Sequence, residues 1–453
     1  MNYRQRVLAV DLGATSIRVA AVDLDTDRPV VEVLHRWRHA PVPDADGALR
    51  WDWDRIVAEV EVGLQAGLES GPVSSIGVDG WGVDYGYLDH SGELVDAPYA
   101  YRDARTEGWE ETAGLIGTHE LYRITGVQLM EINTIFQIAA DGDERLARAD
   151  KLMMLPDLLT HHLTGWVGVE RSNLSTTGLM DADTGDWSDL LIEAVGVPRS
   201  LFPEPANAGT RVGEWNGIPV HLVGSHDTAS AFLGAPSTGM GTVFVSTGSW
   251  VIVGVERDRP DNSQAARDAN FSNEAGALGG IRFLKNVVGF WILEQCREAW
   301  GNPPIETLIA EAEGVDSDVP TFDASDRRFV SPDDMLAEVV AASGLAPDSP
   351  RAVVARSIIE SIVEGVVTVV SEIEGTAGTK AGSLALVGGG ARIPLLARLL
   401  EEKSGLEVVV GSPEATALGS AVVQGIALGR FDDLDEARHW LTPSDAAVES
   451  RGG

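Results

Sequence analysis

Apolar and polar positions along the chain follow two different periods. Residues 7–10 and 17–22 are short apolar runs around the small residues 13–16, which predicts two strands joined by a tight turn. Apolar residues at helical spacing over 56–68 predict a helix, and residues 75–78 return to strand character. The order strand, helix, strand predicts an α/β architecture with a mixed sheet.

A second hairpin pattern occurs much later in the chain. Residues 243–245 lead through the Gly, Ser and Thr residues of 246–249 into a second apolar run, 250–253. Its pattern of strand, small-residue turn and strand is like that of the first hairpin, as expected of an internal duplication. Further on, one apolar face over 352–374 predicts a long packed helix.

Turn-rich sequence over 203–219 precedes the second hairpin, so the predicted domain boundary falls near 234–241. We therefore predict an N-terminal domain over 1–238 and a C-terminal domain over 239–440. A polar tail follows over 441–453.

Composition narrows the possible partners. The chain has 453 residues, and 34 basic against 69 acidic side chains give a net charge of −35. Nucleic acid and anionic membrane surfaces are repelled by such a charge. An anionic small ligand is compatible with it, because backbone amides and a metal ion can hold phosphates locally.

Cys296 is the single cysteine, so no intramolecular disulfide can form and a cytoplasmic location is expected. The longest uncharged stretch, 228–255, is interrupted by glycines, Pro236 and a Ser/Thr turn, and it predicts no membrane span. The sequence leaves the oligomeric state open.

The first turn places Asp11 at the end of a strand, beside small residues that expose backbone amides. Phosphates and a metal ion fit such a turn, and an ordinary hairpin is the alternative for one turn alone. The similar turn at 246–249 favours a pair of turns that grip a polyphosphate from both sides.

Three glycines, Gly388 to Gly390, follow a predicted strand (384–387) and precede a helix predicted to begin near Pro394. This arrangement suits close approach to a nucleotide, although a tight turn and a dinucleotide-binding fold are alternatives. The dinucleotide pattern requires glycine where the chain has Ile393, and no Gly-Lys-Ser or Gly-Lys-Thr of a Walker loop occurs.

Asp227 follows an apolar run, residues 221–223, close to the predicted domain boundary. A carboxylate in a cleft there can accept the proton of an attacking hydroxyl during phosphoryl transfer. A helix N-cap is an equally good interpretation, because residues 228–233 resemble a helix start.

A polar and aromatic cluster spans residues 79–106 and includes Trp81, Asp84 and Arg105. Such mixtures hold sugars. A core tryptophan with surface ion pairs is the interpretation that the spacing alone favours.

Taken together, these residues resemble the FGGY family of carbohydrate kinases, and within it the sequence is most similar to the rhamnulokinases. The resemblance covers roughly residues 7–428. Its most specific parts are residues 80–85 (GWGVDY), 101–106 (YRDART), 133–137 (NTIFQ), 225–230 (SHDTAS) and 284–286 (LKN).

The resemblance implies two RNase H-like domains of the actin-like ATPase, Hsp70 and sugar kinase superfamily with a central cleft, sugar mainly on the first and ATP mainly on the second. It implies Asp227 as catalytic base, and Asp11 as the aspartate associated with Mg²⁺, largely through water. The implied sugar-binding residues are Gly82, His226, Asp227, Thr228 and Asn286, to which the polar cluster adds Trp81 and Arg105. The implied ATP-binding residues are Ala14, Thr15, Ser16, Ile17, Arg18, Ser249, Glu294 and Gly389.

The implied reaction transfers phosphate from ATP to L-rhamnulose and yields L-rhamnulose 1-phosphate, a step of rhamnose catabolism. Glu294 stands where rhamnulokinases can carry glutamine, and Ala391-Arg392-Ile393 replaces a frequently polar segment. The alternatives are a kinase for another ketose, such as L-fuculose or L-xylulose, an actin-like or chaperone-like ATPase, and a nicotinamide-dependent dehydrogenase.

Overall fold

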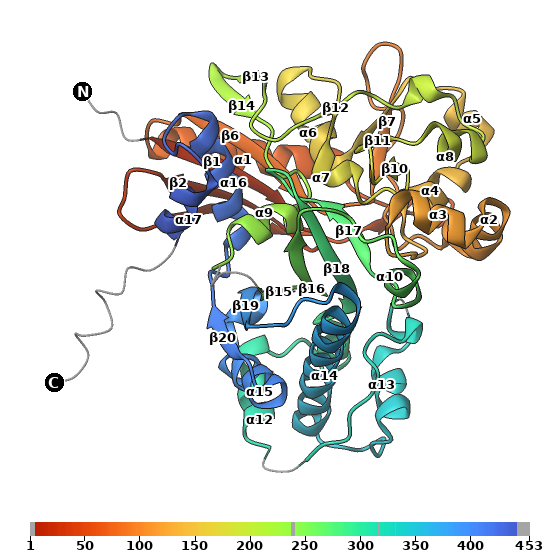
Figure 1. Ribbon diagram of the computed structural model, residues 1–453, viewed down its shortest axis with the longest axis vertical. Coiled ribbons are helices and arrows are strands. Elements are labelled where there is room, and N and C mark those ends of the chain that lie inside the picture. Colours follow the sequence, from red (N-terminus) through yellow and green to blue (C-terminus); the bar gives the residue numbers. More distant parts are fainter. Residues whose placement is uncertain (1–4, 237–240, 316–317, 331, 442–453) are drawn as a thin grey trace. The chain divides into compact units, whose positions relative to one another are not determined.

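A computed structural model describes residues 5–236, 241–315, 318–330 and 332–441 (Figure 1). The chain forms two compact units. Unit 1 comprises residues 1–234, 256–283 and 414–453, and unit 2 comprises residues 235–255 and 284–413. The predicted boundary between 238 and 239 and the tail beyond 441 lie outside the described residues.

Unit 1 is built on a six-stranded mixed sheet with the order β13-β14-β6-β1-β2-β3. Antiparallel pairing of β1 with β2 and parallel pairing of β1 with β6 confirm the first predicted hairpin and the mixed sheet. Parallel pairing brings the carboxyl ends of β1 and β6 to one edge. The strands are β1 (Arg6–Leu12), β2 (Ser16–Asp23), β3 (Val30–Arg38), β6 (Ser75–Gly80), β13 (Arg211–Trp215) and β14 (Ile218–His221).

Helices cover both faces of this sheet because side chains along β1 point alternately to either side. Leu8 and Val10 pack in the cluster that contains helix α1 (Trp53–Ser70), whose N-cap Asp52 accepts from the Arg55 backbone N–H. Val7 packs on the other face against helix α16 (Ala415–Ala427). A C-terminal helix thus completes the N-terminal sheet.

A helical layer with its own apolar core occupies residues 85–202 of unit 1. Its elements are β7 (Tyr85–Leu88), α2 (Trp109–Ile116), α3 (Thr118–Thr125), α4 (Thr134–Ala139), α5 (Asp143–Leu146), β8 (Lys151–Met154), α6 (Leu155–Thr164), β9 (Val169–Glu170), α7 (Arg171–Leu174), β10 (Met180–Asp181), β11 (Asp186–Trp187) and α8 (Asp189–Ala194). The remaining elements of unit 1 are β4 (Val42–Pro43), β5 (Leu49–Arg50), β12 (Pro205–Ala206), α9 (Asp227–Leu233), α10 (Gln264–Asp268), β17 (Ser272–Ala275) and α17 (Leu434–Leu441).

The second six-stranded sheet has the order β17-β18-β16-β15-β19-β20. The unit boundary passes within β16 and β18. The strands and helices of this part are β15 (Thr242–Thr247), β16 (Trp250–Arg257), β18 (Ile281–Val288), α11 (Trp291–Ala299), α12 (Ile305–Glu313), α13 (Met335–Ser343), α14 (Arg351–Ala377), β19 (Ser383–Gly388), α15 (Pro394–Ser404) and β20 (Glu407–Val410).

The two sheets repeat one pairing pattern. In the second sheet β15 pairs antiparallel with β16 and parallel with β19, which pairs parallel with β20. In the first sheet β1 pairs antiparallel with β2 and parallel with β6, which pairs parallel with β14. The predicted second hairpin, the long helix over 352–374 and the repeat are therefore confirmed.

Candidate active site

Asp227 is the first residue of α9, and the N-cap position belongs to His226, whose side chain makes no capping hydrogen bond. The N-cap interpretation of Asp227 is therefore wrong by one residue. The segment before α9 is held from two sides: the Gly80 N–H donates to the Ser225 carbonyl, and the Ser225 N–H donates to the Glu170 carboxylate. Asp227 thus lies at the edge where β6 ends.

The Asp227 side chain stays accessible. Its side chain is 29% exposed, whereas Asp11 and Asp79 are buried. The Thr228 hydroxyl donates to Asp227 Oδ1 over 3.1 Å, and His226 Nε2 lies 3.5 Å from the same oxygen. A substrate hydroxyl can therefore reach Asp227 but not the two buried carboxylates.

Asp11 and Asp79 are neighbours in register on β1 and β6, at the edge where both parallel strands end. Burial raises the pKa of Asp11 to about 6, although the nearby Arg18 guanidinium opposes the rise and the Asp227 charge adds to it. Burial, with the charges of Asp11 and Asp227, raises the pKa of Asp79 well above its ordinary value. Three carboxylates thus share one electrostatic environment.

Arg18 provides the positive charge of this group. Its Nε lies 3.4 Å from Asp11 Oδ2, and its Nη1 donates to Glu414 Oε2 over 3.0 Å. Glu414 immediately precedes α16, so the C-terminal segment contacts strand β2 just after the first predicted phosphate turn.

Asp79 was not predicted as a site residue. Its side chain is fully buried, and neither carboxylate oxygen has a hydrogen-bond partner among the described residues. Buried polar atoms without partners are rare and call for a ligand, an ion or a water molecule. A signal was present in the sequence: Asp79 directly follows the predicted strand 75–78, as Asp11 directly follows the predicted strand 7–10.

The remaining ATP-side residues of unit 1 form the β1–β2 turn and the start of β2. Thr15 is exposed, whereas Ile17 is fully buried in the sheet. The Ser16 N–H and a His39 ring nitrogen both contact the Gly13 carbonyl. The turn is thus at least partly exposed at Ala14, Thr15 and Ser16. The side chain of Ile17 is buried and is not available to a ligand.

Trp81 and Arg105 make protein contacts with their polar groups. Trp81 is buried, and its indole N–H donates to Asp84 over 2.9 Å. Arg105 donates to Gln137 and pairs with Asp141. Trp81 is thus a packed core tryptophan, as the spacing alone favours, whereas the Arg105–Asp141 ion pair is largely buried and does not lie at the surface.

Gly82 is buried in the same segment. A Cβ atom there would lie 2.9 Å from the Thr176 hydroxyl oxygen, so a side chain at this position would collide with Thr176. The next residue, Val83, has a φ of 67°, a conformation that is unusual for a β-branched residue. Strain of this kind gathers at functional sites.

In unit 2 the structure brings together three predicted ATP-side positions. The Thr247 hydroxyl donates to the Val387 carbonyl and accepts from the Gly390 N–H, which joins the β15–β16 turn to the Gly388–Gly390 turn. The Ser249 carbonyl accepts from the Trp291 N–H at the start of α11, the helix that carries Glu294. Ser249, Glu294 and the exposed Gly389 therefore belong to one connected region of unit 2.

Asn286 lies on β18 in unit 2. Glu294, the departure from the rhamnulokinase pattern, accepts from Arg297 Nε over 2.6 Å. The carboxylate that stands in place of the glutamine of rhamnulokinases is thus paired with an arginine of its own helix.

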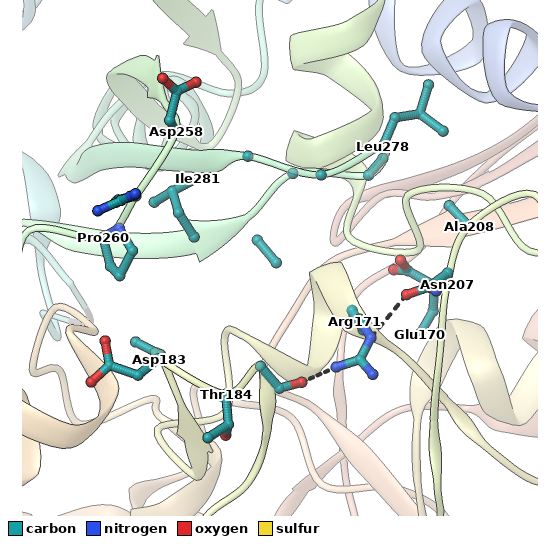
Figure 2. A pocket seen from close by; sticks show the side chains of 18 residues that line it. Glu170, Arg171, Asp183, Thr184, Asn207, Ala208, Asp258, Pro260, Leu278 and Ile281 are labelled. Atoms are coloured by element: carbon teal, nitrogen blue, oxygen red, sulfur yellow. Dashed lines mark hydrogen bonds between the residues drawn. The ribbon is translucent and has the colours of Figure 1, made fainter. Parts of the chain in front are cut away.

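A separate cavity of about 880 Å³ lies in unit 1 (Figure 2). Arg171 crosses one side, where its guanidinium donates to Asn207 and to the Gly185 carbonyl. Asp183 and Asp258 also line this cavity (Figure 2). None of the predicted site residues that the structure describes lines this cavity.

The residues around Asp11 fit a hydrated Mg²⁺ ion, because Asp79 offers two unpartnered carboxylate oxygens and hard oxygen ligands suit Mg²⁺. Within the described ranges, no group of three or more His, Cys, Asp or Glu side chains forms a metal site. An ion held by ATP and water, as predicted for Asp11, needs no such group. In the same ranges no helix is long and apolar enough to cross a bilayer.

Two α/β units with one repeated strand pattern and a phosphate-type turn in each define an actin-like ATPase fold. Solved sugar kinases share it. Gluconate kinase from Lactobacillus acidophilus is 15% identical with a TM-score of 0.79, over 97% of this chain and 92% of that chain. Ligand-bound xylulose kinase from Lactobacillus acidophilus is 15% identical with a TM-score of 0.79, over 96% and 92%. Plasmodium falciparum glycerol kinase with ADP is 16% identical with a TM-score of 0.77, over 98% and 93%.

The sequence identifies the family more closely. Residues 6–234 match the N-terminal domain, and residues 243–428 the C-terminal domain, of the FGGY family of carbohydrate kinases. The chain belongs to the FGGY family of carbohydrate kinases. Its activity is accordingly the ATP-dependent phosphorylation of a sugar. The predicted family and fold class are confirmed.

Proposed function

We propose that this chain phosphorylates a ketose, L-rhamnulose, at O1, with Asp227 as the general base. The observation that carries the proposal is the geometry of Asp227. Of the three aspartates in one electrostatic environment, it alone is accessible, while Asp11 and Asp79 are buried beside Arg18. The choice of L-rhamnulose rests on the sugar-side motifs, residues 80–85 and 225–230 above all.

In the proposed step Asp227 accepts the proton of the O1 hydroxyl as that oxygen attacks the γ-phosphorus of ATP. The new O–P bond forms while the bond from the γ-phosphorus to the β,γ-bridging oxygen breaks, and ADP leaves. The proton remains on Asp227 until it passes to solvent. Positioning and neutralisation of charge supply most of the rate in such transfers.

Other residues of the chain are proposed to bind the nucleotide and to neutralise the charge on its phosphates. We assign Ser249, Gly389 and the β1–β2 turn to the phosphates and nucleotide, with Arg18 holding Asp11 in place. Mg²⁺, when bound with ATP, neutralises charge on the phosphates, and Asp11 and Asp79 are the residues that would hold its water shell.

The test is an ADP-coupled assay with L-rhamnulose, L-fuculose, L-xylulose, D-xylulose and gluconate, followed by ³¹P NMR of the product. We expect the highest kcat/KM with L-rhamnulose and phosphate on O1. A higher kcat/KM with another sugar would overturn the rhamnulose assignment. ADP release without sugar, and unchanged by any sugar, would instead support the actin-like or chaperone-like ATPase.

A further inference from the structure

A buried ion pair lies next to His226, on the side of its ring nitrogen Nδ1. Glu274 on β17 and Arg282 on β18 are 5% and 1% exposed, and Arg282 Nη2 lies 3.2 Å from Glu274 Oε2. Both residues belong to unit 1, together with His226 and Asp227. Burial opposes ionisation of Glu274, but the charge of Arg282 holds its pKa below the ordinary value. No sequence pattern indicated this pair as part of the site.

Both members of the pair face one nitrogen of the imidazole. Arg282 Nη2 lies 3.2 Å from His226 Nδ1, and Glu274 Oε2 lies 3.4 Å from it. Of these two contacts only that of Arg282 has hydrogen-bond geometry, since Glu274 Oε2 accepts no hydrogen bond from the described residues. A guanidinium can only donate, so its contact with Nδ1 is attractive when Nδ1 carries no proton. In a neutral imidazole the proton then sits on Nε2.

Nε2 faces the proposed base. It lies 3.5 Å from Asp227 Oδ1, which also accepts from the Thr228 hydroxyl over 3.1 Å. Among the residues described, no hydrogen bond to Asp227 Oδ2 is found. The Thr228 hydroxyl and His226 Nε2 therefore both lie at Oδ1, which leaves Oδ2 to the proton of the substrate.

We propose that the Glu274–Arg282 pair is a positioning element that fixes the Nε2–H tautomer of His226, so that His226 and Thr228 together orient Asp227 toward the sugar hydroxyl. The inference rests on the proposed role of Asp227. Glu274 holds the guanidinium of Arg282, Arg282 donates to Nδ1, and Nε2–H donates to Asp227. Outer partners fix histidine tautomers in this way at many sites.

A purely structural role is the competing explanation, since a buried ion pair also joins β17 to β18. The double variant Glu274→Gln/Arg282→Gln separates the two roles. It removes both charges together, and neutral replacement of a whole buried pair is commonly tolerated by the fold. The matched control is Arg257→Gln/Asp261→Asn, which removes an ion pair of the same segment, 256–283; in the described structure this pair makes no hydrogen bond or ion pair with His226.

The double variant should lower kcat for the sugar on the order of tenfold to hundredfold while KM for ATP and the Tm stay close to those of the wild type. The control pair should leave kcat unchanged. Wild-type kcat in a folded double variant, or an equal loss of kcat in the control, overturns the inference.

Nitrogen NMR of the full-length protein, labelled with ¹⁵N-histidine, tests the tautomer even where the double variant does not fold. The His226 signals are assigned by their loss in His226→Asn. We expect a pyridine-type Nδ1 and a pyrrole-type Nε2 in the wild type. A protonated Nδ1 with a bare Nε2 overturns the inference.

Failure of the inference is distinguishable from failure of the proposed function. If the wild type phosphorylates the sugar and Asp227→Asn does not, while the double variant is fully active, the positioning role alone is wrong. If Asp227→Asn retains its sugar kinase activity, the proposed function is wrong, whatever the tautomer of His226.

Discussion

Asp79 shows how a single residue can be placed for function at the expense of stability. It is fully buried, its carboxylate has no hydrogen-bond partner among the described residues, and its pKa is raised well above the ordinary value, first by burial. A neutral side chain of the same shape removes the cost of a buried charge.

Asp79→Asn should therefore raise the unfolding free energy of the ligand-free protein by about 1 kcal/mol at neutral pH. The same change should lower kcat with Mg²⁺ and ATP, because it alters one of the two side chains that we propose would hold the water shell of Mg²⁺. Urea denaturation and steady-state kinetics measure the two effects. A less stable variant with full activity contradicts this account of Asp79.

Asp84 makes stability depend on pH. Burial raises its pKa to about 6, against hydrogen bonds from Trp51, Trp81 and Gln137 that lower it. A raised pKa in the folded state stabilises the fold at low pH, and this contribution is lost as pH rises from the ordinary value of 3.8 through about 6.

Between pH 5 and pH 8 the unfolding free energy of the wild type, relative to Asp84→Asn, should fall by about 1 kcal/mol. Denaturant titrations of both proteins at the two pH values give this difference. A constant or rising difference would show that Asp84 keeps its ordinary pKa.

Residue positions were predicted from the sequence where a local pattern marks them. Asp11 and Asp227 each end an apolar run, so both could be named. Glu274 and Arg282 could not be predicted, because their role depends on a pairing across two strands and on a histidine about fifty residues earlier.

Among the elements, α9 and α16 determine where Asp227 is held. The two helices pack so closely that a Cβ atom on Gly419 would lie 1.7 Å from the Ser230 carbonyl oxygen, a backbone atom that cannot move aside alone. Any side chain on Gly419 must therefore displace α9, and Asp227 is the first residue of that helix.

Gly419→Ala should lower the unfolding free energy by about 1–3 kcal/mol and lower kcat as well. The matched control is Gly375→Ala in α14, where a Cβ atom meets nothing within 4 Å. Since alanine favours helix over glycine, the control should gain up to about 1 kcal/mol. Thermal unfolding and kinetics of both variants test the pair; equal stability in the two would show that α9 and α16 are not in close contact.

The hairpins, helix α1 and helix α14 could be predicted because their hydrophobic periods are regular. The contact of α9 with α16 could not, since it joins residues almost two hundred positions apart and depends on the absence of a side chain. Hydrophobic periodicity cannot indicate that a helix position requires glycine when the requirement comes from close contact with a backbone segment distant in the sequence.

For the whole molecule, the predicted domains were contiguous halves of the chain. In the structure, residues 256–283 and 414–441 lie in unit 1 with the N-terminal sheet. The reason is physical: α16 buries Leu418 and Val422 against Val7 of β1. A discontinuous unit of this kind leaves no mark in local sequence, whereas the repeat of two hairpins does.

The central claim for the whole molecule is that a sugar kinase of this family uses Asp227 as its base. The most direct measurement is single-turnover formation of sugar phosphate by Asp227→Asn and by the wild type, with ATP affinity and Tm determined in parallel. The account predicts a loss of rate on the order of 10² to 10⁴-fold, with ATP affinity and Tm nearly unchanged. Sugar phosphate formed at a rate close to that of the wild type would contradict it.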